Sequence, residues 1–490
     1  MKSSTQSAVV PAPPAAWRGT ANGDPRLSRA VAVPNPDSDI LLKLAFWFFV
    51  VDLFLTMSKL LEIMAVSGGF RIPYLGLTIH LVTFGLALVS GGARRVVSTR
   101  LGVFLVLFTV WMMVCTLAST WRGGSVDTLL REWVPSFVIF AGCGTVVTLL
   151  QCRKAATVLA AGTTIIAGAS YLLASVKQDR LAFEGGTLGN SNDLSLLLVL
   201  GLPFLLAPVF WKGSSNLRKL MAMALGLMVL VVVIRSASRG SLVALLTILL
   251  ILFWTQPFAG KLKLGLLSIV MATAFFALTP REILSRYVTI FGDAEKNDDV
   301  ATSAEYSSMA RRELLEQSLK LTMAHPLFGV GPGIFVVGEA KLAEAEGQKA
   351  MWHVSHNTYT QVSSEMGIPG LLLYLAALWA TFRNVFWFRA HSRIDPTGRV
   401  SAMGLAFLLS LAGLCVGLTF SSSAYLPYLP ILMGLSVVFR KSLEREMDLH
   451  ARSSVLTAPE PPMAAPVKPA GTSSGKPVYR FLGRPRRSGA

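Results

Sequence analysis

Residues 354–382 read VSHNTYTQVSSEMGIPGLLLYLAALWATF, and this stretch changes character near its middle. The first half is polar and holds a histidine beside an asparagine, His356 and Asn357. The second half, residues 371–382, is an apolar segment that follows without a break. A membrane-spanning helix needs about 20 mostly apolar residues. The sequence therefore predicts a histidine at the edge of a membrane helix.

The rest of the chain has the same apolar character. Hydrophobic residues make up 53% of its 490 residues and charged residues only 15%, whereas a soluble domain carries about 25% charged residues. About twelve apolar stretches, residues 40–64 and 132–150 among them, are long enough to cross a bilayer. Only helices and closed barrels satisfy their backbone in lipid, and these solid runs lack the alternation of a barrel. The sequence predicts an all-α polytopic membrane protein with about 12 transmembrane helices and one large outer loop.

Lysine and arginine in the short loops predict the orientation, because they are enriched on the cytoplasmic side. One set of alternate loops holds fourteen of these residues and the opposite set holds seven. The richer set is predicted to face the cytoplasm together with both termini, so the long loop, residues 280–362, faces outward. This arrangement explains much of the net charge of +18, which therefore gives no reason to expect nucleic acid as a partner.

Composition divides the chain into five regions. Residues 1–38 and 446–490 are polar and rich in proline, and both are predicted to be disordered cytoplasmic tails. No apolar segment lies near Met1, so no signal peptide is expected. Residues 39–211 hold the N-terminal membrane helices, residues 212–385 the central region with the long loop, and residues 386–445 the C-terminal helices.

Few charged side chains fall within the apolar stretches. The first stretch carries Asp52, Lys59 and Glu62, whose spacings of seven and three residues predict one shared helical face. Charges inside a span usually face a cavity or a partner, and the sequence leaves structural and functional roles equally open for the three. The cysteines and histidines show no metal-ligand spacing, so we expect no metal and no other cofactor.

Polar motifs gather on the predicted outer side. Residues 185–195 read GGTLGNSNDLS, in which Asn190 and Asn192 are candidate binding residues, and a helix N-cap role for Asn192 or Ser191 is the alternative. Residues 234–242 read IRSASRGSL and place Arg235 and Arg239 on the side where positive charge is scarce. Guanidinium groups bind phosphate in a bidentate manner. The two arginines therefore predict an anionic ligand, with bonding to loop carbonyls as the structural alternative.

The long loop carries two further motifs. The pattern of residues 303–324 predicts an amphipathic helix along the outer surface, with Arg311 and Arg312 near its middle. The helix is expected to end at HPLFGVGPG, residues 325–333, where Pro326 and three glycines follow. Backbone amides of a glycine-rich loop can hold phosphate, but a simple tight turn is the favoured interpretation of this one.

In their order and spacing these motifs resemble the O-antigen ligase family, which includes O-antigen and exopolysaccharide polymerases and some protein O-oligosaccharyltransferases. The resemblance covers residues 185–385 and rests on GTLGNSND, SASRG, the HPLFGVGPGIF block and a His-Asn-x9-Gly-x-x-Gly pattern. In this chain the last pattern comprises His356, Asn357, Gly367 and Gly370. The first five predicted spans and both tails carry no matching motif.

The resemblance implies a GT-C-like membrane glycosyltransferase. Such an enzyme takes a glycan from undecaprenyl diphosphate at the periplasmic face of the bacterial inner membrane. It transfers the glycan, with inversion at the anomeric centre, to a hydroxyl group of lipid A-core, of a growing polysaccharide or of a protein, and needs neither a nucleotide sugar nor a metal.

The resemblance also implies roles for individual residues. His356 corresponds to the general base, a task that suits the pKa of histidine. Arg239 and Arg312 correspond to the catalytic arginines, with Arg311 as the alternative to Arg312. Substrate contacts are expected from a surrounding group of side chains: Arg235, Arg311, Asn190, Asn192 and Asn357.

A lipid-linked oligosaccharide flippase or another multi-span transporter is the alternative function. Such transporters usually carry paired broken helices in two related halves, and the sequence shows no internal repeat. A structural partner in a polysaccharide-assembly complex is a third class, which would not need His356. Assembly proteins are also expected as partners of the enzyme itself, and the motifs leave its acceptor open.

Overall fold

The computed structural model describes residues 39–67, 75–177, 180–183, 187–279, 284, 287, 299–392 and 395–456. The chain divides into one compact unit, residues 1–445, and a second unit, residues 446–490. The tail predicted for residues 1–38 lies outside the described residues, as do residues 457–490 of the other tail and residues 288–298 of the predicted outer loop.

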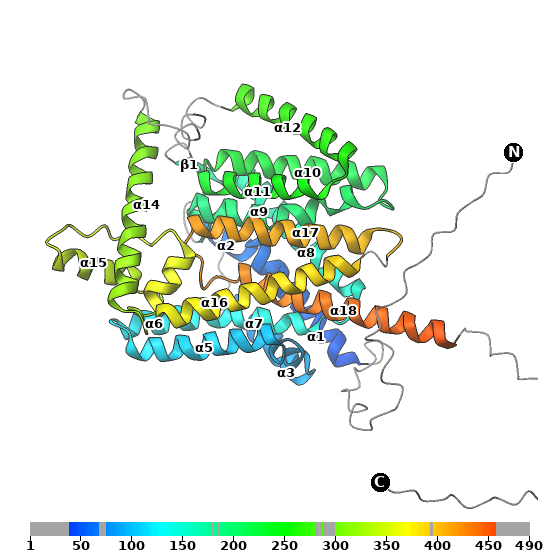
Figure 1. The fold of residues 1–490 in the computed structure, drawn as a ribbon, viewed down its shortest axis with the longest axis horizontal. Coiled ribbons are helices and arrows are strands. Elements are labelled where there is room, and N and C mark those ends of the chain that lie inside the picture. Colours follow the sequence, from blue (N-terminus) through cyan, green and yellow to red (C-terminus); the bar gives the residue numbers. More distant parts are fainter. Residues whose placement is uncertain are drawn as a thin grey trace, which may run out of the picture. The chain divides into compact units, whose positions relative to one another are not determined.

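The described part of the chain is almost entirely helical (Figure 1). One antiparallel pair of short strands is formed by β1 (Ser175–Lys177) and β2 (Arg180–Ala182). The helices, in chain order, are α1 (Ile40–Ser58), α2 (Leu60–Ser67), α3 (Leu75–Val89), α4 (Gly92–Val97), α5 (Arg100–Ala118), α6 (Arg122–Thr128), α7 (Val134–Gly142), α8 (Leu149–Leu173), α9 (Ser191–Phe210), α10 (Asn216–Arg235), α11 (Arg239–Thr255), α12 (Phe258–Leu278), α14 (Asp299–Ala324), α15 (Phe335–Ala345), α16 (Thr358–His391), α17 (Arg399–Gly417) and α18 (Tyr428–Leu456).

Seven helices among the described residues are long and apolar enough to cross a membrane, namely α1, α5, α8, α9, α10, α16 and α17. Two shorter apolar helices, α3 and α11, accompany them. The prediction of an all-α polytopic membrane protein is thereby confirmed. Twelve complete spans and an outward-facing long loop stay predictions.

Two of the predicted spans are interrupted. The stretch at residues 40–64 is divided at Lys59, whose backbone is left-handed (φ 50°), so Asp52 lies on α1 while Glu62 lies on α2. The three charges therefore do not share one continuous helix. The stretch at residues 132–150 becomes a π-helical turn (Leu129–Trp133), the short α7 and a 3-10 turn (Cys143–Thr145). Close packing fixes this turn, because a Cβ on Gly144 would collide with the carbonyl of Gly92.

The long helices lie side by side and form the core of the bundle (Figure 1). α9 packs against α17 and α10, α16 packs along α5, and α1 packs along α8. α9 and α17 are the most enclosed of the spans, with 67% and 72% of their apolar windows buried. Gly417 permits their close approach, because a Cβ there would collide with Leu196.

One end of the bundle carries the helices of the predicted outer loop. α14 runs across the ends of the long helices, with α15 packed against it (Figure 1). α14 buries Leu314 and Leu321 in a cluster with Val330, and the Thr322 hydroxyl lies 2.8 Å from the Ser363 hydroxyl of α16. The helix predicted at residues 303–324 is thus present and is docked on α16.

The glycine-rich loop after α14 runs beside a kink in α16. The N–H groups of Val330 and Gly331 donate to the carbonyls of Ser364 and Glu365 at 2.9 and 3.0 Å. The kink lies at Gly367, whose φ of 72° and ψ of −177° are accessible to glycine and strained for other residues. Backbone bonds across the kink therefore hold α14 and α16 in a fixed relation.

Glu365 completes this junction. Its carboxyl group, 2% exposed, accepts bonds from the N–H groups of Gly333 (2.9 Å) and Phe335 (3.2 Å) and from the Tyr425 hydroxyl (2.7 Å). The loop amides are therefore bound to acceptors of the protein itself. The glycine-rich loop acts as a structural turn, which is the interpretation that the sequence favoured over a phosphate cradle.

Candidate functional site

A cavity of about 490 Å³ lies at the end of the bundle that carries α14. Four stretches distant in sequence meet there: β2, the turn that begins α9, the middle of α14 and the segment that precedes α16. The cavity thereby gathers two arginines, two histidines and two asparagines. The residues that line it are Arg180, Ala182, Gly189, Asn190, Ser191, Asn192, Ala310, Arg311, Leu314, His353 and His356.

His356 reaches the cavity through an unusual backbone conformation. Its φ of 51° lies in the left-handed region, which few residues other than glycine adopt. The His356 N–H donates to the Ser422 hydroxyl at 2.8 Å, and the Ser355 hydroxyl lies 3.2 Å from the same oxygen. Strain held by such bonds is typical of functional sites. Here it accompanies a ring that lines the cavity.

Asn357 fixes the start of α16. Its side-chain oxygen accepts bonds from the N–H groups of Tyr359 (3.0 Å) and Thr360 (3.2 Å), the pattern of a helix N-cap. The Thr358 hydroxyl donates to the Ser421 carbonyl at 2.7 Å and ties the helix start to the loop after α17. Asn357 caps the helix directly after His356 and does not line the cavity, and its contact with substrate stays a prediction.

The electrostatic surroundings keep His356 neutral. Its pKa is lowered to about 4, first by burial and then by Arg311, His353 and Arg180 nearby. An imidazole with this pKa is unprotonated at neutral pH, which is the state in which a ring nitrogen accepts a proton. The two arginines come from α14 and β2, so guanidinium groups from two separate elements lie near His356 in the cavity.

Helix geometry distinguishes the two neighbouring arginines of α14. Successive residues of an α-helix point about 100° apart. Arg311 lines the cavity together with Ala310 and Leu314, whereas Arg312 is exposed and does not line it. The sequence assigned the catalytic role to Arg312 with Arg311 as the alternative, and the structure places Arg311 at the cavity.

Arg180 is a cavity residue that the motifs did not predict. Its Nε donates to the Ser236 carbonyl at 3.3 Å, and its Nη2 donates to the Asn192 side-chain oxygen at 2.8 Å. Asn192 is buried and also accepts a bond from the Ser238 hydroxyl at 2.9 Å. One guanidinium thus joins the GTLGNSND and SASRG motifs. The sequence offered one indication of a role for Arg180, namely that it is an arginine on the side of the membrane predicted to be poor in positive charge.

Arg235 and Arg239 flank this junction without lining the cavity. Arg235 is the exposed last residue of α10. Arg239 is the first residue of α11 and directly follows the N-cap Ser238, whose hydroxyl contacts Asn192. Arg239 therefore lies beside the wall of the cavity, and Arg235 lies one turn before it in the chain.

Asn190 has a capping role. Its side-chain oxygen accepts a bond from the Asn192 N–H at 3.0 Å, so it is the N-cap of α9 in place of Asn192 or Ser191, which the sequence had suggested. Both asparagines nevertheless line the cavity. Capping and contact with a ligand use different atoms of the Asn190 amide, so the two roles are compatible.

The three charges of the first predicted span have structural contacts. Glu62 accepts a bond from the Leu188 N–H at 3.1 Å and lies 3.7 Å from Lys59, so this pair supports the turn before α9. Asp52 lies 2.8 Å from His80 of α3. Only the first of these contacts adjoins the cavity.

The lining of the cavity carries positive charge. Within the described part of the chain, no group of three or more His, Cys, Asp or Glu side chains is placed to hold a metal ion. The charged side chains that line the cavity are arginines, which bind phosphate oxygens through charge-assisted hydrogen bonds.

Comparison with known proteins agrees with this geometry. Residues 223–375 match the family model described as O-antigen ligase. No curated protein matches the chain. The matched segment includes Arg239, Arg311 and His356, whereas Arg180 and Asn192 precede it. The resemblance inferred from the motifs is confirmed over this segment, which is similar to the O-antigen ligase family.

Proposed function

We propose that the chain transfers a glycan from undecaprenyl diphosphate to a hydroxyl group, in the cavity lined by His356, Arg311 and Arg180. The family supports a glycosyltransferase of the O-antigen ligase or polymerase type. One observation carries the placement of the site: a neutral histidine and two arginines from distant segments converge on one cavity. The acceptor, whether lipid A-core, a growing polysaccharide or a protein, stays open.

The arginines suit the leaving group. As the bond between C1 of the sugar and the phosphate oxygen breaks, negative charge develops on the diphosphate, and fixed cationic donors stabilise it. Arg311 and Arg180 approach from different elements, α14 and β2. The bonds from Arg180 to Asn192 and Ser236 orient its guanidinium before any substrate binds. We place Arg239, beside the cavity wall, as a further contact of the carrier.

The histidine suits the attacking group. We infer that His356 takes the proton of the acceptor hydroxyl while its oxygen forms a bond to C1. The C1–phosphate bond breaks in the same step, and undecaprenyl diphosphate leaves as an anion. Attack from the side opposite the diphosphate inverts the anomeric centre. No carboxylate lines the described cavity, so His356 and the exposed His353 are the bases at hand.

The proposed activity has a direct assay. Purified full-length protein is incubated with undecaprenyl-diphosphate-linked glycan and an acceptor, with a chelator present. We expect glycan on the acceptor and an equal amount of released undecaprenyl diphosphate. In proteoliposomes, movement of intact lipid-linked glycan across the bilayer without release would instead indicate the flippase alternative, for which the family match gives no support.

The pH dependence of transfer follows from the pKa of His356. A general base must be neutral, so activity falls as the pH decreases through its pKa. In the free enzyme this pKa is about 4. A bound diphosphate offsets the charges of Arg311 and Arg180 and thereby raises it. We expect the acid limb of the kcat profile at a higher pH than the acid limb of the kcat/KM profile. Limbs in the reverse order would contradict the assignment, and activity regained at neutral pH controls for acid inactivation.

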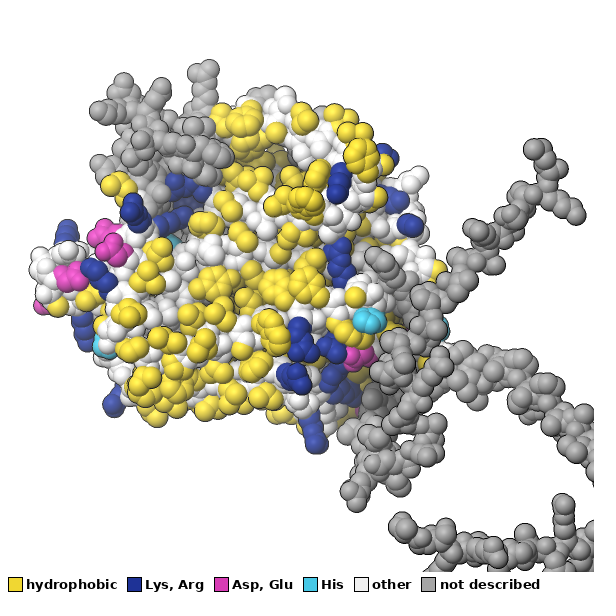
Figure 2. All heavy atoms as spheres, viewed as in Figure 1, with side chains coloured by type: hydrophobic (Ala, Val, Ile, Leu, Met, Phe, Trp, Pro, Cys, Tyr) yellow, Lys and Arg dark blue, Asp and Glu magenta, His cyan; other side chains and the backbone are white. Residues whose placement is uncertain are grey.

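We propose that the cavity end of the bundle faces the periplasm of a bacterial inner membrane and that both termini face the cytoplasm. Figure 2 shows Lys and Arg side chains at both ends of the bundle, and the orientation rests on the count of fourteen of these residues in one set of loops against seven in the other. A reporter fused after Ala345 should behave as periplasmic and one fused after Ala451 as cytoplasmic. The reverse pattern would place the cavity away from the donor glycan and overturn the proposed site.

A further inference from the structure

A second cavity, of about 380 Å³, lies where the start of α5, the later part of α16 and α18 meet. Arg383 lines this cavity, whereas Thr358 begins α16 beside the His356 site. At 1.5 Å per residue the two positions lie roughly 35 Å apart along the helix. The second cavity is therefore at the opposite end of the bundle and is separate from the proposed catalytic site.

The second cavity has an excess of positive charge. Arg100, Arg383, Arg440 and Lys441 line it, and Glu444 is the one acidic residue of its lining. Glu444 is already paired with Arg440, at 2.8 Å. None of the ion pairs formed within the described ranges involves the other three cations. Four cationic side chains thus line one cavity with a single carboxylate, and that carboxylate is paired with Arg440.

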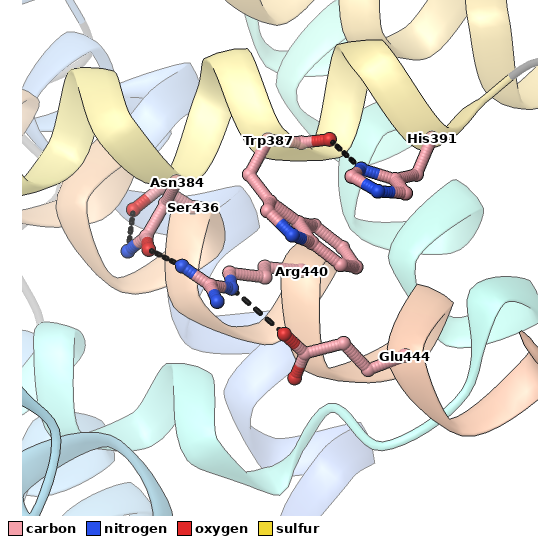
Figure 3. A network of polar contacts seen from close by, with 6 residues as sticks. All are labelled: Asn384, Trp387, His391, Ser436, Arg440 and Glu444. Atoms are coloured by element: carbon pink, nitrogen blue, oxygen red, sulfur yellow. Dashed lines mark hydrogen bonds and ion pairs between the residues drawn. The ribbon is translucent and has the colours of Figure 1, made fainter. Parts of the chain in front are cut away.

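A network of hydrogen bonds holds Arg440, one of these cations, in place (Figure 3). Arg440 of α18 donates through Nη1 to the side-chain oxygen of Asn384 (3.3 Å), and Asn384 donates through Nδ2 to the Ser436 hydroxyl (3.3 Å). The Arg440 guanidinium lies over the Trp387 ring, 4.8 Å from its centroid. Arg440 therefore joins α18 to α16, which leaves Arg100 and Arg383 available to a ligand. Lys441 donates one hydrogen bond to the Arg95 carbonyl at 2.6 Å and keeps two further ammonium hydrogens for a ligand.

Apolar surface leads away from the cavity along its helices. On α16, Trp379, Leu375 and Leu372 follow at helical spacing and are 56%, 39% and 61% exposed. Arg383 stacks on Trp379 with 5.0 Å between the guanidinium carbon and the ring centroid. On α5, Val103 is exposed one turn after Arg100. The basic cavity thus opens beside surface that suits acyl chains, and the tryptophan next to Arg383 is of the residue type enriched at membrane–water interfaces.

We propose that this cavity binds the phosphate-bearing headgroup of an anionic membrane lipid, whose acyl chains lie on the exposed faces of α16 and α5. Basic pockets between transmembrane helices are a recurring site for such headgroups. A soluble phosphate would satisfy the cations but would gain nothing from the adjoining apolar surface. The inference goes beyond the proposed transfer reaction and does not depend on it, because the two cavities lie at opposite ends of the bundle.

Native mass spectrometry of the full chain tests the proposal. The protein is released from detergent after titration with phosphatidylglycerol or with phosphatidylcholine, and bound lipid is counted. We expect preferential retention of phosphatidylglycerol. The Arg383→Gln/Lys441→Gln double variant is expected to bind it about 30-fold more weakly, as the loss of two surface charges near a headgroup implies. The Lys261→Gln/Lys263→Gln variant removes two charges from α12, outside this cavity, and should bind like the parent.

Each outcome decides the proposal. Equal weakening by the two double variants would mean that lipid binding depends on the overall positive charge of the protein and not on this cavity. Equal retention of phosphatidylcholine would show that binding does not require an anionic headgroup. Full competition by millimolar inorganic phosphate would identify a soluble phosphate as the ligand. Both substituted residues are exposed, and an unchanged unfolding temperature confirms that the Arg383→Gln/Lys441→Gln variant is folded.

Discussion

Replacement of His356 by alanine is expected to slow glycan transfer by roughly 10²–10⁴-fold, the usual contribution of a general base. The imidazole is the neutral, partly buried base in a cavity whose described lining holds no carboxylate. Binding of the lipid-linked donor is expected to persist, because Arg311 and Arg180 hold the diphosphate. Transfer by the purified variant, measured beside donor binding, checks both expectations.

Two further variants test whether His356 acts as a base and whether it is the only base in the cavity. His356→Gln should behave like the alanine variant, since glutamine forms hydrogen bonds but does not take up a proton in this pH range. His353→Ala removes the exposed histidine of the same cavity and is expected to retain most of the activity. Near-normal turnover of His356→Gln would show that the residue orients the acceptor, and catalysis would then rest on the arginines and on proximity. Loss of turnover in His353→Ala alone would show that His353, and not His356, is the general base.

Arg311→Ala is expected to lower the transfer rate by about 10²–10³-fold, as for removal of one donor that stabilises developing negative charge. Arg311 lines the cavity beside His356, and its charge is among the causes of the low pKa of that histidine. Arg311→Lys should also fail, because a point charge does not replace the bidentate guanidinium. Initial rates at saturating acceptor, over a range of donor concentrations, measure the effect.

Arg312 supplies the matched control for this prediction. It is the next residue of the same helix, carries the same charge and is exposed outside the cavity. Arg312→Ala should therefore retain activity within a few fold, and both variants should reach the membrane in normal amounts. Sensitivity of Arg312 with tolerance at Arg311 would return the catalytic role to the residue that the sequence favoured.

Most of the fold was predictable from the lengths of the apolar stretches in the sequence. The stretches that predict membrane helices correspond to helices from α1 to α18, and the amphipathic pattern at residues 303–324 corresponds to α14. The interruptions were not predictable, because they depend on tertiary contacts. Lys59 adopts a left-handed conformation within an apolar stretch, and α7 is short where Gly144 passes close to Gly92. Neither contact leaves a periodic signal in the sequence.

The candidate site was predictable to the extent that its residues lie within motifs. His356 was identified by its pairing with Asn357 and the spacing to the following glycines, and it lines the cavity. The choice between Arg311 and Arg312 needed the rotation of α14 against its neighbours, which spacing alone does not fix. Arg180 lies on a short strand before the first motif, and its contacts with Asn192 and Ser236 exist only once α9 and α10 are packed together.

The most direct test of the proposed site is a cryo-electron microscopy structure of His356→Gln, which should bind donor without turning it over, with undecaprenyl-diphosphate-linked glycan. We predict density for the diphosphate between Arg180 and Arg311, with the anomeric carbon of the first sugar facing residue 356. Diphosphate density beside the exposed Arg235 or Arg312, outside the cavity, or at the opposite end of the bundle, would contradict the account.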